Sequence, residues 1–225
     1  MPRHDRFDSA GRPGTSAGWQ PRPIGVPQGT RRIFLASAFS GFVGLGLGSI
    51  ILSLGAQIAK NLIHTDSALI QGLILGISAV LIGAVGLAAR SLPPRTSSIA
   101  GGLTAAASIL LFIPAASQHS IALYVISQVL GGAGLGFSLL GGIGYIHRYA
   151  PARHRGQLVS AFYLACYVGQ GVLSTFAGLA ATAWGLQSAI DVFAPIIAVL
   201  GVLAALVAVT TRTSAARTSA RPSPK

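Results

Sequence analysis

The stretch QVLGGAGLGFSLLGGIGYIHRYAPARHRGQLVSAFYLACYVGQGVLSTFAG, residues 128–178, decides the fold of this chain. It consists of two long apolar runs joined by one short basic turn, His147 to Gln157. The cationic and aromatic side chains in and before that turn are Arg148, Arg153, Arg155, Tyr145 and Tyr149. Apolar runs of this length around a cationic turn with tyrosines are typical of two membrane helices that meet at the cytoplasmic face.

The composition of the whole chain indicates an integral membrane protein. Of its 225 residues, 52% are hydrophobic and only 9% are charged, whereas soluble domains carry about 25% charged residues. The net charge of +12 would suit a nucleic-acid partner, but the basic residues are confined to the chain ends and to short turns between apolar runs. This placement favours membrane orientation, so we expect a lipid bilayer as partner and no nucleic acid.

Six apolar segments predict an all-α, polytopic fold with six transmembrane helices. Each segment is close to the roughly 20 residues that span a hydrocarbon core. Their approximate bounds are 33–56, 69–89, 97–116, 121–146, 158–183 and 191–210. Residues 31–211 therefore form the predicted transmembrane bundle. Residues 1–30 and 212–225 are basic and lack apolar runs, which predicts two disordered cytoplasmic tails.

The distribution of basic residues predicts the orientation of the bundle. Of the 16 Lys and Arg residues, 15 lie in the two tails or in the turns after the second and fourth segments, all on one side of the membrane. Lys60 alone falls on the other side. Cytoplasmic segments carry the excess of Lys and Arg. We therefore expect a multi-pass protein of the cell membrane, plasma or inner, with both termini in the cytoplasm.

A weak internal repeat is visible at an offset of about 90 residues. Gly44-Leu45-Gly46 in the first segment then aligns with Gly134-Leu135-Gly136 in the fourth. Each copy contains three membrane crossings, so the second copy starts on the opposite side of the membrane from the first. This predicts two inverted three-helix repeats. Identity beyond the triplet is slight, so a chance match of two glycine-rich helices is the alternative.

The residue types show no enzymatic constellation, and we expect no catalytic residue, cofactor or metal. The sequence has no paired-carboxylate site, no metal-ligand spacing of His and Cys and no nucleophile motif. The run from Gly131 to Gly136 lies within an apolar segment with no strand before it, which favours close helix packing over a phosphate loop. Asp66 and Asp191 stand at the starts of segments and are expected to be helix N-caps.

Uncharged polar side chains within the apolar segments are the candidates for solute contact. They are costly to expose to lipid and are expected to face the bundle interior or a watery cavity. Gln128, one turn after Tyr124, and Gln170 are the strongest candidates. Tyr163, Tyr167 and Gln170 share one helix face. A structural hydrogen-bond network between helices is the alternative. The four glutamines concerned are Gln57, Gln71, Gln128 and Gln170.

The central stretch also resembles a known family of transporters. A glycine-rich helix followed by YAPARHRG (residues 149–156), SAFY (160–163) and YVG (167–169) is similar to the tenth-to-eleventh helix region of the major facilitator superfamily. The resemblance covers residues 31–211 and matches the C-terminal six-helix half of the usual twelve-helix transporter. It implies secondary active transport of a small solute by alternating access, with the site between two six-helix bundles.

The resemblance also implies a role for each helix. The first and fourth segments are expected to line the central cavity, the second and fifth to flank it, and the third and sixth to face lipid. The family's cytoplasmic signature, G-x-x-x-D-R/K-x-G-R-R/K, aligns with GLAARSLPPR from Gly86. Only Gly86 and Arg95 match, and Arg90 stands in place of the Asp. The cavity candidates are Ser40, Ser49, Tyr124, Gln128, Tyr167 and Gln170.

Six helices make up half of such a transporter, so the resemblance implies a partner. A second copy of the chain or a separately encoded half would cover the cavity-facing surface. Arg148, Arg153 and Arg155 are expected to form a cytoplasmic gate that contacts carboxylates of the partner or anionic lipid headgroups; membrane topology alone is their alternative role. The competing hypothesis is a truncated or remnant half, or a small membrane scaffold, with no transport activity on its own.

Overall fold

The computed structural model describes residues 31–63 and 68–210, and the secondary structure of this part is all helical. The six α-helices are α1 (Arg31–Ile63), α2 (Ala68–Ala88), α3 (Pro94–Ser117), α4 (Ile121–Tyr149), α5 (Arg155–Trp184) and α6 (Leu186–Thr210), with the short 3-10 helix η2 (Ala152–His154) before α5. The predicted all-α fold with six helices is confirmed. The predicted tails, 1–30 and 212–225, and Asp66 lie outside the described residues.

Pro or Gly marks several of the helix boundaries. Pro94 opens α3, at a position where its missing N–H leaves no helical hydrogen bond unmade. Pro151 follows Ala150, which is extended with φ −82° and ψ 139° and ends α4, because a residue before proline avoids the helical region. Gly185, with φ 89°, separates α5 from α6; this left-handed conformation suits glycine, which has no Cβ.

The start of α6 differs from the sequence prediction. The apolar pattern predicts a helix from Asp191, whereas α6 begins at Leu186. The chain turns at Gly185 and resumes a helix directly after it, so Asp191 lies beyond the first turn and does not cap the helix. Its Oδ1 atom accepts a hydrogen bond from Nε2 of Gln187 at 2.9 Å.

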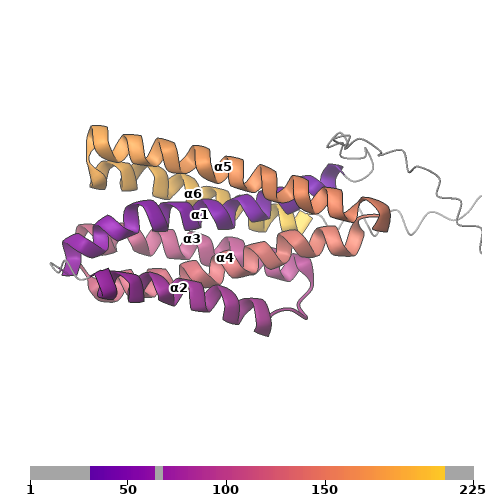
Figure 1. Cartoon of the computed structure of the whole chain (residues 1–225), viewed down its shortest axis with the longest axis horizontal. Coiled ribbons are helices and arrows are strands. Elements are labelled where there is room, and N and C mark those ends of the chain that lie inside the picture. Colours follow the sequence, from indigo (N-terminus) through magenta and orange to yellow (C-terminus); the bar gives the residue numbers. More distant parts are fainter. Residues whose placement is uncertain (1–30, 64–67, 211–225) are drawn as a thin grey trace, which may run out of the picture.

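Five of the described helices, α1 and α3 to α6, are long and apolar enough to cross a membrane, and α2 contributes a shorter apolar stretch, Gly76–Ala88. The start of α1, the end of α6 and the α2–α3 and α4–α5 turns lie at the same end of the bundle, on the right in Figure 1. We call it the basic end. The described arginines gather there: Arg31, Arg32, Arg90, Arg95, Arg148, Arg153 and Arg155.

The helices form two layers. The front layer has the order α2, α4, α1, α5, because α4 packs against both α2 and α1, and α1 packs against α5 (Figure 1). The back layer is the pair α3 and α6, with α3 also against α4 and α6 also against α1. Among the five apolar spans of the described chain, α1 has the largest share of its residues buried inside the bundle, 56%, and α5 has the smallest share, 17%. The outer helices of the front layer, α2 and α5, therefore keep large unpartnered surfaces.

Glycines let the layers approach closely. Gly102 of α3 lies against the carbonyl oxygen of Gly201 in α6, and a Cβ atom on Gly102 would collide with it. A Cβ atom on Gly134 of α4 would lie 2.9 Å from the amide nitrogen of Ala105 in α3. The glycine-rich run in α4 is thus confirmed as a packing surface, where small residues allow backbone-to-backbone contact.

Two apolar clusters fill the interior. The larger lies between the layers and includes Leu47 of α1. The smaller lies at the basic end, between α1, α4 and α5, around Phe162, whose ring occupies the space that a side chain on Gly41 would need. Cys166 belongs to this cluster, and its Sγ atom lies 3.7 Å from the carbonyl oxygen of Ala38. These contacts fix α5 against α1, and α5 also packs against α6.

Candidate functional site

Tyr124 and Gln128 form a buried polar network where α4 meets α1 and α2. Both side chains have 0% exposure. The Tyr124 hydroxyl donates to the carbonyl oxygen of Gly55 in α1 at 3.0 Å, and Nε2 of Gln128 donates to the Tyr124 oxygen at 2.7 Å. The Ser78 hydroxyl of α2 lies 3.0 Å from both the backbone oxygen and Oε1 of Gln128. The network therefore ties three front-layer helices together.

Ser40 and Ser49 are buried as well. The Ser40 hydroxyl lies 3.1 Å from that of Ser98 and 3.0 Å from the carbonyl oxygen of Ser138, which joins α1 to α3 and α4. The Ser49 hydroxyl donates to the carbonyl oxygen of Gly46 in its own helix at 2.8 Å. In this conformation a solute does not reach these two serines, nor Tyr124 and Gln128. Their contact with solute stays a prediction, and their observed contacts are interhelical or intrahelical hydrogen bonds.

Tyr167 and Gln170 have a different setting, on the accessible side of α5. The rings of Tyr163 and Tyr167 stack with centroids 5.9 Å apart and planes at 19°, and Tyr167 is 58% exposed. Gln170 is half-buried, and its Oε1 atom has no hydrogen-bond partner among the described residues. The structure thus brings the predicted α5 residues together. Gln57 is exposed near the end of α1, and the side chain of Gln71 lies outside the described residues.

The basic turn between α4 and α5 is held mainly by local contacts. Nη2 of Arg155 donates to the carbonyl oxygen of Ala150 at 3.5 Å. The guanidinium carbon of Arg148 lies 6.0 Å from the centroid of the Tyr149 ring, at the limit of a cation–π contact. The side chain of Arg153 lies outside the described residues. The gate role of these three arginines therefore remains a prediction.

Arg95, one of the two residues that match the family signature, has a structural role. Its Nε atom donates to the carbonyl oxygen of Ala208 at 3.0 Å, and its Nη2 atom donates to that of Val209 at 3.1 Å. These carbonyls belong to the last turn of α6, where a helix leaves its oxygens unpaired. Arg95 thus fastens the start of α3 to the end of α6.

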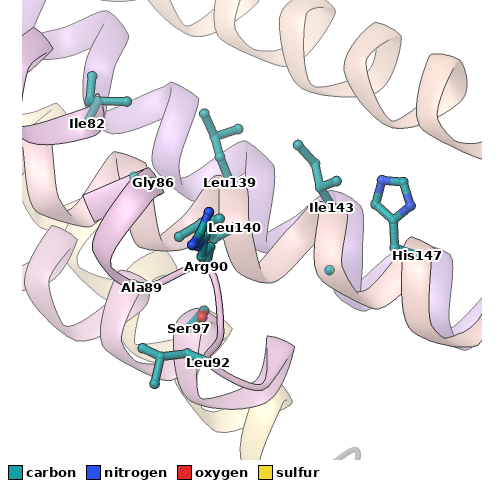
Figure 2. Close-up of a pocket in the computed structure, with 12 residues that line it drawn as sticks. Ile82, Gly86, Ala89, Arg90, Leu92, Ser97, Leu139, Leu140, Ile143 and His147 are labelled. Carbon is teal, nitrogen blue, oxygen red and sulfur yellow. The ribbon is translucent and has the colours of Figure 1, made fainter. Parts of the chain in front are cut away.

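Two grooves run along the outside of α2 and α4. The apolar groove has a volume of about 720 Å³ and is lined by Gly72, Leu73, Gly76, Ile77, Val80, Leu81 and Val129. The basic groove lies at the basic end, has a volume of about 390 Å³, and is bounded by the end of α2, the start of α3 and the last turns of α4. Figure 2 shows Leu139, Ile143 and His147 projecting from the same side of α4, and Arg90 in the turn that follows α2.

The basic groove contains polar residues that the sequence pattern did not bring together. Arg90, Ser97 and His147 come from the ends of three helices, and 57 residues separate Arg90 from His147. The one feature of the sequence that points to this groove is Arg90, which stands where the cytoplasmic signature of the family has an Asp. Ser78, which completes the Tyr124–Gln128 network, has no sequence signal because a serine in a membrane helix usually bonds within its own helix.

Acidic and metal-binding groups are scarce in the described part of the chain. Residues 31–63 and 68–210 contain no group of three or more His, Cys, Asp or Glu side chains that could hold a metal ion. Asp191 is the one carboxylate side chain in these ranges, and it lies near the start of α6, away from the basic end. The accessible polar groups of the front layer are therefore suited to hydrogen bonding and ring contacts.

These features define a polytopic helical membrane protein whose front layer carries its accessible polar groups. A family model described as Major Facilitator Superfamily matches residues 29–225. The chain therefore belongs to the Major Facilitator Superfamily, and the resemblance of its central stretch is confirmed. Membrane transport follows as its general function. Neither the curated proteins nor the solved structures give a match to the chain.

Proposed function

We propose that the chain is one half of an alternating-access transporter for a small solute, and that a second six-helix bundle covers its front layer. The observation that carries this proposal is the open glycine surface on α2 and α5, the two edges of that layer. Membership in the superfamily supports the transport class. In such transporters two bundles rock around a site near the bilayer midplane.

The open glycines are Gly72, Gly76, Gly83 and Gly86 on α2, and Gly156, Gly171 and Gly178 on α5. At each of them an added Cβ atom would meet nothing within 4 Å. Elsewhere in the bundle, glycines lie where helices touch closely, as Gly102 does. Small residues on a helix surface allow a second helix to approach. We therefore expect helices of another bundle, either a second copy or a separate half, against α2 and α5.

The packing supports two inverted three-helix repeats. In such a repeat α1 corresponds to α4, and α2 corresponds to α5. A contact between α1 and α5 then requires an equivalent contact between α4 and α2. Both pairs of helices pack together. A Cβ atom on Gly46 of α1 would lie 3.2 Å from Leu173 of α5. A Cβ atom on its counterpart, Gly136 of α4, would lie 3.1 Å from Val85 of α2. The second glycine of the repeated triplet thus has a corresponding neighbour in each half.

We expect the solute to pass along the face of α5 that carries Tyr167 and Gln170. Of the polar candidates, Tyr167 is exposed in the single bundle and Gln170 is half-buried. The stacked pair of Tyr163 and Tyr167 offers ring faces to an apolar or planar group. Oε1 of Gln170, which is buried in this conformation, is an acceptor without a partner among the described residues. This combination favours a neutral or amphipathic solute. Tyr124 and Gln128 then hold the front-layer helices in position behind that path.

The basic end is proposed to face the cytoplasm of a cell membrane. The support is the concentration of arginines at that end in a chain whose acidic residues number only 4 against 16 Lys and Arg, since cytoplasmic segments carry the excess of basic residues. Arg148, Arg153 and Arg155 then lie where a cytoplasmic gate would close against the second bundle.

Reconstitution tests the proposal. The purified chain is placed in proteoliposomes, alone and with a coexpressed N-terminal half, and uptake of a panel of neutral and amphipathic solutes is measured. Stoichiometry in nanodiscs is measured in parallel. We expect two bundles per unit and transport that Tyr167→Ala reduces. A single bundle that associates with no partner and moves no solute of the panel would instead support a remnant half or a small scaffold.

A further inference from the structure

We propose that the basic groove between α2, α3 and α4 binds an anionic phospholipid, with the phosphate at Arg90 and one acyl chain along the apolar wall below it. This inference does not rest on the proposed transport mechanism, because a lipid would occupy the groove in either a transporter or a scaffold.

The wall of the basic groove suits a hydrocarbon chain. Ile82, Leu139 and Ile143 line it, within a volume of about 390 Å³. Gly86 leaves further room, since a Cβ atom there would meet nothing within 4 Å. Between Ile82 and the end of the helix at Ala88 the groove follows α2 for about 9 Å at the rise of an α-helix. A large part of an acyl chain therefore fits against protein in place of neighbouring lipid.

The mouth of the basic groove suits a phosphate. Arg90 and His147 are both exposed there, and the buried Ser97 lines the groove beside them. The guanidinium group of arginine presents its N–H donors in a planar fork that matches phosphate oxygens. These groups lie at the basic end, at the level where the chain leaves the apolar spans. Lipid headgroups lie at the same level.

The charge balance of the bundle calls for an anion at this place. Arg95 and Arg155 donate to backbone carbonyls, whereas Arg90 has no hydrogen bond or ion pair with any residue in 31–63 or 68–210. The one carboxylate of those ranges, Asp191, belongs to α6 at the far end of the bundle. Basic pockets between membrane helices on the cytoplasmic side bind anionic headgroups. An anionic lipid supplies both the missing charge and the apolar filling, which a neutral lipid does not.

Lipid retention measured by native mass spectrometry tests the site. The full chain is purified in mild detergent with phosphatidylglycerol or phosphatidylcholine, and bound lipids per chain are counted. We expect one phosphatidylglycerol to be retained. Arg90→Gln is expected to weaken it about fivefold, the usual effect of one interfacial arginine. Gly86→Leu is expected to weaken it about tenfold, because the new side chain displaces about two methylene groups of the lipid.

Two matched variants control for charge and volume. Arg148→Gln removes a cation one residue from His147, and Gly171→Leu adds the same volume at an open glycine of α5; both are expected to retain lipid like the unchanged chain. If Arg90→Gln does not fold, His147→Gln and Gly86→Leu carry the same test.

Three results would overturn the proposal. The first is equal retention of phosphatidylglycerol by the unchanged chain and by folded Arg90→Gln and Gly86→Leu. The second is displacement of the lipid by soluble glycerol phosphate at equal concentration, which would identify a free-phosphate site. The third is a Gly86→Leu chain that keeps its lipid but loses association with a second bundle, which would assign the groove to a partner helix.

Discussion

The buried network of Tyr124, Gln128 and Ser78 permits a quantitative test of what Gln128 does. Gln128→Leu removes the hydrogen bond from Nε2 to Tyr124, and it removes Oε1, one of the two acceptors that share the single Ser78 hydroxyl proton. The Tyr124 hydroxyl keeps its bond to Gly55, and Ser78 keeps the backbone oxygen of Gln128. No partner is left wholly unpaired, so the loss is about 0.6 kcal/mol for the Tyr124 bond in a membrane bundle and at most as much for the shared Ser78 bond, or up to about 1.2 kcal/mol in total.

A double-mutant cycle with Tyr124→Phe isolates the bond that the two side chains share. Tyr124→Phe removes two bonds and costs about 1.2 kcal/mol, but the double variant adds only the loss of Oε1 at Ser78 and costs up to about 1.8 kcal/mol. The sum of the single effects should therefore exceed the double by about 0.6 kcal/mol. Equilibrium unfolding in mixed micelles measures the three free energies. Gln170→Leu is the matched control, and we expect no loss of stability because its Oε1 atom has no partner in the described chain.

Two outcomes would refute this reasoning. Strict additivity of Tyr124→Phe and Gln128→Leu would mean that the shared bond contributes nothing. Unchanged stability of Gln128→Leu together with abolished transport would mean that Gln128 contacts the solute, as the sequence pattern alone predicts, and that the network is not its main role.

Three further perturbations test the packing. Gly102→Ala should destabilise the chain by about 1–3 kcal/mol, because the new methyl group meets backbone atoms that cannot move aside. Gly83→Ala, in open space, should be neutral or slightly stabilising. Equal unfolding free energies of the two variants would contradict the close α3–α6 contact. Phe162→Ala should cost about 3–5 kcal/mol by leaving a cavity, and the exposed Phe176→Ala less than about 1 kcal/mol; similar losses would contradict the buried position of Phe162. Arg95→Gln should speed hydrogen exchange in the last turn of α6 and not in α1, and unchanged exchange would remove its capping role.

The helices were predictable because each apolar run is long and is bounded by Pro, Gly, charged or other polar residues. Hydropathy marks the apolar part of a helix and not its hydrogen-bonded length. This is why α6 begins five residues before Asp191, directly after Gly185. The family followed from the residues of one turn and its flanks, since that pattern was already specific enough to suggest it.

The candidate site was harder to predict, because a polar residue in a membrane helix can face either a cavity or another helix. Gln128 and Gln170 look alike in sequence, yet one is sealed among three helices and the other lies on the accessible side of α5. The difference depends on Ser78 and Gly55, which are distant in sequence and supply the partners of the buried network. Arg90 and His147 line one groove for a similar reason, since only the packing of α2 on α4 brings these two parts of the chain together.

The sealed position of Cys166 has a practical consequence for experiments on this chain. It is the one cysteine of the sequence, and its side chain has 0% exposure. Thiol-reactive probes should therefore leave the folded native chain unlabelled. A cysteine introduced at an open position, as in Gly72→Cys or Gly171→Cys, is then the one thiol that reacts, so Cys166 need not be replaced first. Distances between spin labels or fluorophores on two bundles can be measured directly.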